Sequence, residues 1–197
     1  MFQYTSLFIL YVFGFLAESI EGKIQVKIIN TTGIPNPDHL EMTVNLIKSA
    51  NGEVVDVDSN LKADIGSALF LWIDLQTKTE VSGYETLFKS ENLDLCILLD
   101  SAKEHPLAIP FLENVNKHGN IPQTCPISKG HYYLKGFHIN GEILPSFCPS
   151  GNFRLNFGVT YLSQNNITEK LFEMKWDVEI INDSQIGTGM EIPGSSS

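Results

Sequence analysis

The sequence predicts an all-β fold, an antiparallel β-sandwich with one short helical excursion. Hydrophobic and polar residues alternate strictly over nine residues, 172–180, within the segment 171–181, and the same two-residue period recurs through most of the chain. This period is typical of strands with one buried and one solvated face. Turn-forming residues separate the alternating segments, as they do in sandwiches. Only residues 94–120 depart, because Leu107, Phe111 and Val115 recur every four positions, which is helical spacing.

The first three strands are expected at residues 24–28, 40–46 and 53–57, and apolar residues occupy every second position in the first two. The Asn51-Gly52 pair lies between the second and third of these segments and is a tight-turn signal. We therefore expect those two strands to pair with each other.

The fourth strand, at residues 69–75, is apolar on both faces. Leu69, Leu71 and Ile73 share one face, while Phe70 and Trp72 lie on the other. Such a strand is expected where a second layer covers the outer face, or where that face meets a partner.

The remaining strands are expected at residues 84–89, 131–139, 152–162 and 171–181. A turn signal at residues 163–166 predicts that the last two form a hairpin.

Residues 94–120 are expected to form one or two short helical turns, with Pro106 and Pro110 near their starts. Residues 185–197 are small and polar, which predicts a flexible C-terminal tail.

Size and charge limit the possible functions. The chain has 197 residues, enough for one domain with a sizeable core, which we place at residues 20–184. Its 13 Lys and Arg against 23 Asp and Glu give a formal net charge of −10. This acidity argues against a protein that binds the phosphates of nucleic acids.

The N-terminal residues predict export. Residues 7–17 are an uncharged apolar run, too short to span a bilayer, which needs about 20 residues. The run fits the core of a signal peptide over residues 1–19, with cleavage after Ser19. The absence of Lys or Arg before the run and Glu18 at its exit are atypical; a short buried helix or an uncleaved anchor is the alternative. We expect a secreted, extracellular protein with no membrane span.

If the protein is exported, its cysteines can form a disulfide and its three N-glycosylation motifs can be modified. Cys96, Cys125 and Cys148 can form one disulfide in an oxidising compartment, and each of the three pairings leaves one thiol over. Sequons for N-glycosylation begin at Asn30, Asn166 and Asn182.

No catalytic motif is found in the sequence. It lacks a G-x-S-x-G elbow, a phosphate-binding glycine loop, an H-E-x-x-H pair and a dinucleotide fingerprint. The five histidines show no metal-ligand spacing, and no general base accompanies Cys148. We expect no catalytic residue, no metal and no cofactor, and therefore a protein that is not an enzyme.

One short sequence motif points to a particular protein family. Residues 125–133 read CPISKGHYY, and a C-P-I-x-K-G-x-x-Y run that opens a late strand resembles the ML lipid-recognition superfamily. That group includes the Niemann-Pick type C cholesterol carrier, the ganglioside activator protein and mite allergens. A wider ordered set, spread over residues 84–181, resembles the insect branch of secreted ML-like proteins, which includes a large family of unknown function and the chemosensory B proteins. This set comprises Tyr84, Leu87-Phe88, Leu93-Asp94-Leu95-Cys96, Pro106-Leu107, Gly119-Asn120, Cys125-Pro126-Ile127, Leu144-Pro145 and Pro149-Ser150-Gly151.

The resemblance implies an immunoglobulin-like sandwich of the E-set or ML type. It also implies a disulfide between Cys96 and Cys125, because that branch keeps a cysteine pair at these positions. The cholesterol carrier has three bridges, whereas this chain can form at most one, and Cys148 has no partner that the resemblance suggests.

The resemblance further implies that a lipid tail enters an apolar cavity between two splayed sheets. Inward residues on opposing strands would line it, although each could equally be ordinary core; the candidates are Leu71, Ile73, Phe88, Phe111, Phe153, Phe157 and Trp176. The expected function is a secreted protein that binds a small hydrophobic ligand, a lipid or hydrocarbon, with contact chemosensation as the process that the insect branch suggests. The alternative is an accessory protein with a filled core that binds a receptor or ion channel through its surface.

Overall fold

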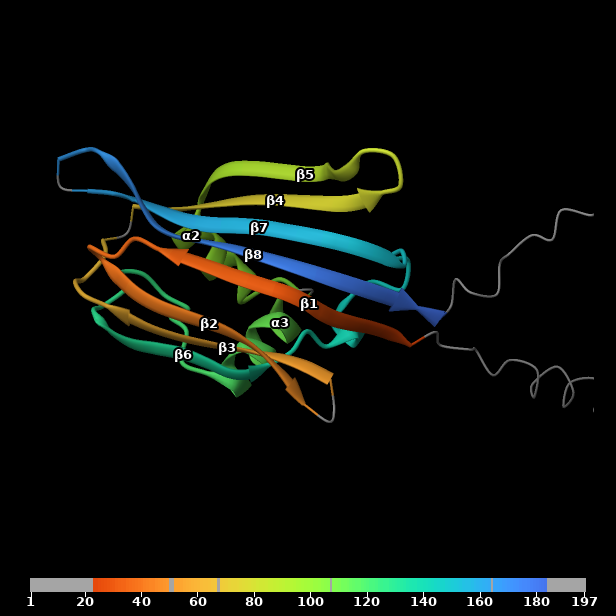
Figure 1. Ribbon diagram of the computed structural model, residues 1–197. Coiled ribbons are helices and arrows are strands. Elements are labelled where there is room, and N and C mark those ends of the chain that lie inside the picture. The colour runs from red at the N-terminus through yellow and green to blue at the C-terminus, as the bar shows by residue number, and fades with distance from the viewer. Residues whose placement is uncertain (1–22, 50–51, 67, 107, 164, 184–197) are drawn as a thin grey trace, which may run out of the picture.

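The computed structural model of the chain (Figure 1) describes residues 23–183, except 50–51, 67, 107 and 164. The expected signal peptide at residues 1–19 and the expected tail at residues 185–197 lie outside the described residues.

The described chain forms two antiparallel sheets packed together, which confirms the predicted β-sandwich. The large sheet contains, in spatial order, β1 (Ile24–Pro35), β8 (Thr168–Asn182), β7 (Gly151–Leu162), β4 (Leu69–Thr79) and β5 (Gly83–Asp94). The small sheet contains β2 (Leu40–Ser49), β3 (Gly52–Leu61) and β6 (Gly130–Phe137). In Figure 1 the large sheet runs from β5 at the top to β1, and the small sheet lies below it. All eight expected strands are present.

The strand register explains why the alternation in the sequence was informative. In the β7–β8 hairpin, Phe157 lies opposite Met174 and Leu155 lies opposite Trp176, so the apolar residues of both strands share the inner face. Even positions of β8 from Met174 to Asn182 are buried and the odd positions between them are half-buried. The predicted β2–β3 pairing is also present.

Two helices account for the stretch that broke the alternation. Helix α2 (Leu95–Ala102) begins at Asp94, whose carboxylate accepts a hydrogen bond from the Ile97 N–H and so caps the first turn. Helix α3 (Ile109–His118) has Pro110 in its first turn, where the missing N–H has no partner to lose. A short 3-10 turn, η1 (Gly141–Ile143), precedes β7.

The segment between α3 and β6 is held to the protein at both ends. The Cys96–Cys125 disulfide, which confirms the predicted pairing, joins this segment to α2. At its start, the Asn120 side chain accepts a hydrogen bond from the Tyr133 N–H and donates one to the His131 carbonyl. Gly119 packs so closely here that a Cβ would lie 1.8 Å from the Tyr133 carbonyl oxygen, so no larger residue fits without a backbone shift.

The interior contains two core clusters. One includes Val57, Phe137, Phe153 and Trp176, together with the buried half of β8. The other gathers residues near the opposite end of the sheets, Leu40, Leu61, Ile65, Leu69, Val159, Tyr161 and Leu171. A domain of this size usually has one contiguous core, so the separation marks a place where packing is interrupted.

Strand β5 is an edge of the large sheet and its pairing with β4 is irregular. The register shifts between Leu71 and Ile73, and again between Leu75 and Gln76. Asn92 has a positive φ of 57° beside the first shift. Most of β5 is exposed, because neither the small sheet nor a helix fully covers this edge.

Candidate functional site

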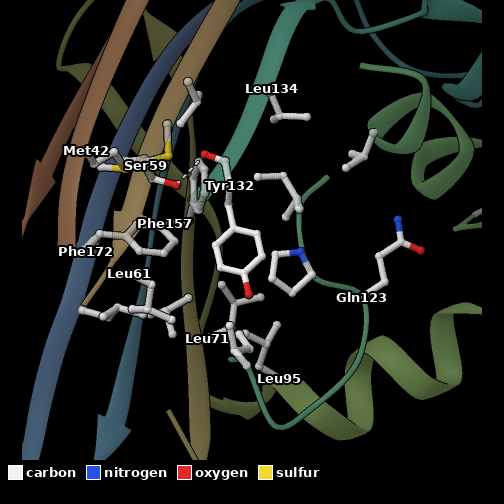
Figure 2. Close-up of a pocket in the computed structure, with 18 of the residues that line it drawn as sticks. Met42, Ser59, Leu61, Leu71, Leu95, Gln123, Tyr132, Leu134, Phe157 and Phe172 are labelled. Carbon is white, nitrogen blue, oxygen red and sulfur yellow. Dashed lines mark hydrogen bonds between the residues drawn. The ribbon is translucent and has the colours of Figure 1, made fainter. Parts of the chain in front are cut away.

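A cavity of about 360 Å³ lies between the two sheets, where half-buried side chains such as Met42 and Phe172 stand between the two clusters of buried residues. Its walls come from both sheets, both helices and the segment that leads into β6. Figure 2 shows the Tyr132 ring between Phe157 and Phe172 on one side and Gln123 on the other. Ordinary protein interiors leave few voids larger than a water molecule, so this space is a structural feature that needs an explanation.

The sheets supply the deep walls of the cavity. Most of these side chains are buried, and they include Leu40, Val57, Leu61, Leu134, Phe137, Val159, Leu171, Met174 and Trp176. They point inward because the two-residue period of each strand aligns its apolar positions on one face.

The helices and the connecting segment supply the outer wall. Leu95 and Leu99, one helical turn apart on α2, are both half-buried, as are Pro122 and Gln123. Phe111 of α3 lines the cavity and is still 44% exposed. Because exposure rises toward these residues, the cavity opens to solvent on the side of the helices.

Few polar groups face the cavity, and those that do are already hydrogen-bonded. The Ser59 hydroxyl donates to the Tyr132 carbonyl at 3.0 Å, and the Tyr132 hydroxyl donates to the Ser128 carbonyl at 2.6 Å. The Gln123 amide donates to Asn116 Oδ1 at 2.6 Å. Among the residues that the structure describes, no charged side chain lines the cavity. The site therefore suits an uncharged, apolar molecule that needs no hydrogen bond.

Trp176 is the largest side chain in the wall. Its ring lies 5.8 Å from Phe137 and 5.9 Å from Phe157, measured between centroids. Its buried Nε1–H makes no hydrogen bond in the part of the chain that the structure describes. Aromatic packing, rather than a polar contact, fixes this indole.

Four of the seven ligand-site candidates from the sequence line the cavity: Leu71, Phe111, Phe157 and Trp176. The structure brings these four together from three strands and one helix, although they are up to 105 positions apart in the sequence.

The other three candidates lie elsewhere. Phe153 is 7% exposed and packs in the closed core, so it belongs to the fold rather than to the cavity. Ile73 shares the face of Leu71 on β4 but is not part of the cavity wall. Phe88 is 52% exposed on β5, because this edge of the large sheet extends past the small sheet.

Sequence reasoning missed the contribution of α2 and of the segment before β6. Leu95 and Leu99 show the four-residue spacing of a helix face, which was a usable signal. Nothing in the sequence marks Ile121, Pro122 and Gln123, because an irregular segment has no period.

A polar cluster closes the end of the sandwich next to the cavity. His39 Nε2, directly before β2, lies 2.9 Å from Glu169 Oε2 on β8 and 2.8 Å from the Tyr161 hydroxyl on β7. The Tyr161 hydroxyl donates to Glu169 Oε2 at 3.0 Å. Burial, followed by the bond to Glu169, raises the pKa of Tyr161 to about 12. The bonds from His39 and then Tyr161 lower the pKa of Glu169 below its usual value. This cluster joins the two sheets.

The three sequons differ in accessibility. Asn166 is exposed in the β7–β8 turn, and Asn30 is exposed on β1. Asn182 does not fit the expectation, because its side chain is fully buried and its Nδ2 donates to the carbonyls of Ser146 and Cys148. The nitrogen that a glycan would need is therefore enclosed in the fold.

Cys148 is the cysteine outside the disulfide. Its thiol is half-buried, and burial raises its pKa, so the reactive thiolate is disfavoured.

Within the described ranges, no three His, Cys, Asp or Glu side chains come together to hold a metal ion. No helix in these ranges has both the length and the apolar character needed to cross a bilayer.

Comparison with known protein families gives one match. Residues 73–155 match the family described as "Protein of unknown function (DUF1091)". The matched segment runs from β4 into β7 and contains both helices, the disulfide and β6. No curated protein matches the chain. The chain is thus similar, over the part that carries the helices and the outer wall of the cavity, to a family whose function is not described.

Proposed function

We propose that this protein binds a small hydrophobic ligand, a lipid or hydrocarbon, in the cavity between its two sheets. The observation that carries the proposal is an apolar space of about 360 Å³ between two separate core clusters. Its size is within the range of small-molecule sites, about 300–1,000 Å³.

An empty space of this size is energetically unfavourable. Side chains that face an unfilled space lose the packing contacts that a filled core would give them, and this lowers stability. A ligand that fills the cavity restores contacts and removes its own apolar surface from water, at about 25 cal/mol per Å².

The wall selects the ligand class. A charged headgroup inside the cavity would lose its hydration without gaining a partner, because the donors of Ser59, Gln123 and Tyr132 in the wall are already paired. The opening beside Phe111 leaves room for a polar end to remain in solvent. An acyl chain or an unbranched hydrocarbon meets both conditions.

The sequence resemblance supports the same proposal. The C-P-I run at residues 125–127 resembles that of the ML lipid-recognition superfamily, and the match to the family of unknown function is compatible with an ML-like protein. On this basis we propose secretion, with contact chemosensation as the setting.

Native mass spectrometry of the protein purified from a secreting eukaryotic host tests the proposal. We expect a mass increment that disappears on denaturation and that organic extraction identifies as a lipid or hydrocarbon. A Leu71→Trp variant places a larger ring in the cavity and should lose the increment, whereas Leu87→Trp, at an exposed site on β5, should retain it. If the wild-type protein carries no ligand and takes up no fluorescent fatty acid, the proposal is wrong.

The second candidate function is docking to a receptor or ion channel. Exposed apolar side chains on β5 and α2, among them Leu87, Phe88 and Ile97, favour it. A Leu87→Ser/Phe88→Ser variant that keeps its ligand but loses a biological response would support docking rather than transport.

A further inference from the structure

The outer face of the large sheet, opposite the cavity, has a second pocket of about 360 Å³. The strand register builds it from neighbouring positions on four strands. Trp72 of β4 lies opposite Gly158 of β7, which lies opposite Glu173 of β8, which lies opposite Ile34 of β1. These residues form one row across the sheet.

A second row runs beside the first. Asp74 of β4 lies opposite Asn156 of β7, which lies opposite Lys175 of β8. All three side chains line the pocket. The pocket therefore combines one indole, two carboxylates, one amide and one ammonium group with two apolar residues, Ile34 and Met174, of which Met174 also lines the inner cavity.

Gly158 makes this arrangement possible. A Cβ at this position would lie 2.7 Å from Trp72 Nε1 and 2.5 Å from the Phe172 carbonyl oxygen. A glycine inside a strand often marks such a close approach. Because Gly158 has no side chain, the indole packs down on the sheet while remaining half-exposed toward the pocket.

The polar groups around the indole are partly fixed and partly available. Gln76 Nε2 and Thr86 Oγ1 donate to the two oxygens of Asp74, at 2.7 and 3.0 Å, which orients that carboxylate. Lys170 pairs with Glu173 at 2.6 Å. Within the described residues, the Asn156 amide and Trp72 Nε1 make no hydrogen bond. They remain available to a ligand.

The composition of the pocket discriminates among ligand classes. Two carboxylates against one ammonium disfavour phosphates and other anions. An apolar ligand would bury these polar groups without partners. A small cation would leave the donors of Asn156, Lys175 and Trp72 unused. A neutral ring with several hydroxyls uses both donors and acceptors, and its flat C–H face packs on the indole.

We propose that the outer face of the large sheet binds one sugar unit of a neutral glycan at Trp72. The proposal does not depend on a ligand in the inner cavity, because β4, β7 and β8 separate the two sites. It also gives a reason for the apolar outer face of β4, which no other described element covers.

The test is binding of the purified full-length protein to a panel of immobilised neutral glycans ending in glucose, galactose, mannose or N-acetylglucosamine. Titration of the best glycan in solution follows. We expect Trp72→Ala to weaken binding at least tenfold, and Asn156→Ala severalfold. Phe88→Ala removes a partly exposed aromatic ring on the other face of the same sheet and should leave the affinity unchanged.

If Trp72→Ala fails to fold, Asn156→Ala still tests the proposal. Binding to sialylated glycans or amines alone would overturn the proposal, as would the absence of any glycan binding. Affinity that is equal in the wild-type protein and in both Trp72→Ala and Asn156→Ala would overturn it too. Inner-cavity loading, measured by native mass spectrometry on the same samples, reports separately on the proposed hydrophobic ligand.

Discussion

His39 Nε2 lies 2.8 Å from the Tyr161 hydroxyl, so a residue that precedes the small sheet contacts the β7–β8 hairpin of the large sheet near its turn. The two rings meet edge to face, with centroids 5.2 Å apart. Glu169 completes the contact by accepting from both groups. The cluster is therefore a polar link between the sheets at one end of the cavity.

This link should make stability depend on pH in the acid range. Because the folded-state pKa of Glu169 is lowered, its contribution is present above the unfolded-state value, near 4.5, and is lost as the pH falls through the folded-state value. Urea unfolding at pH 6 and pH 3 should show a smaller decrease for Glu169→Gln than for the wild-type protein. Glu53→Gln, a carboxyl on β3, is the control. Equal decreases for Glu169→Gln and the wild type would contradict the prediction.

Gly119→Ala should destabilise the protein by about 1–3 kcal/mol, a typical effect of overpacking. The new methyl group would lie 1.8 Å from the Tyr133 carbonyl oxygen and would push the segment before β6 away from that strand. Gly66→Ala is a matched control, because no atom lies within 4 Å of its added Cβ. Thermal unfolding of the two variants measures the difference, and similar melting temperatures would show that the close approach is not restrictive.

Removal of the disulfide by Cys96→Ala/Cys125→Ala should lower the free energy of unfolding by about 3–4 kcal/mol, the chain-entropy value for a loop of this length. The cysteines are 29 positions apart. Because the bridge also holds α2 at the cavity wall, affinity for a fluorescent fatty acid should fall as well. Cys148→Ala keeps the bridge and should retain that affinity.

Phe153 and Phe88 were both ligand-site candidates from the sequence, but their replacement by alanine should affect stability differently. Phe153→Ala removes a ring that is 7% exposed and should cost about 3–5 kcal/mol, as for other buried aromatic residues. Phe88→Ala removes a ring that is 52% exposed and should change stability by no more than about 0.5 kcal/mol. Chemical denaturation of both variants checks this, and a large loss for Phe88→Ala would mean that the β5 edge is covered.

The sequons should differ in whether they carry a glycan. In a secreting host we expect Asn166 to carry sugar, because it lies in an exposed turn, and Asn182 to carry none, because its amide is bonded to two carbonyls. Enzymatic deglycosylation followed by mass spectrometry of peptides locates the modified residues. An occupied Asn182 would mean that the end of β8 is open during or after folding.

The strands could be predicted because their evidence is local. A strand with one dry face must alternate, and β8 does so from Met174 to Asn182, so its existence and direction of burial were readable. Asp94 and Pro110 likewise mark helix starts through chemistry that depends only on neighbours in the chain.

The cavity could not be predicted in the same way, because a hollow depends on how far apart the sheets lie. Phe153 and Phe157 occupy equivalent positions on one strand face, yet one packs in a closed core and the other lines the cavity. The burial of Asn182 could not be predicted for a related reason: three residues show a motif but not that the chain around Ser146 folds over it.

The irregular pairing of β5 affects how separate molecules meet. With 12 residues at an open edge, this strand is long enough to serve as a template on which another chain could add a strand. The two register shifts and the left-handed Asn92 interrupt its row of backbone donors and acceptors, so an incoming strand would find no continuous ladder to extend. The irregular pairing of β5 thus disfavours edge-to-edge polymerisation of crowded molecules.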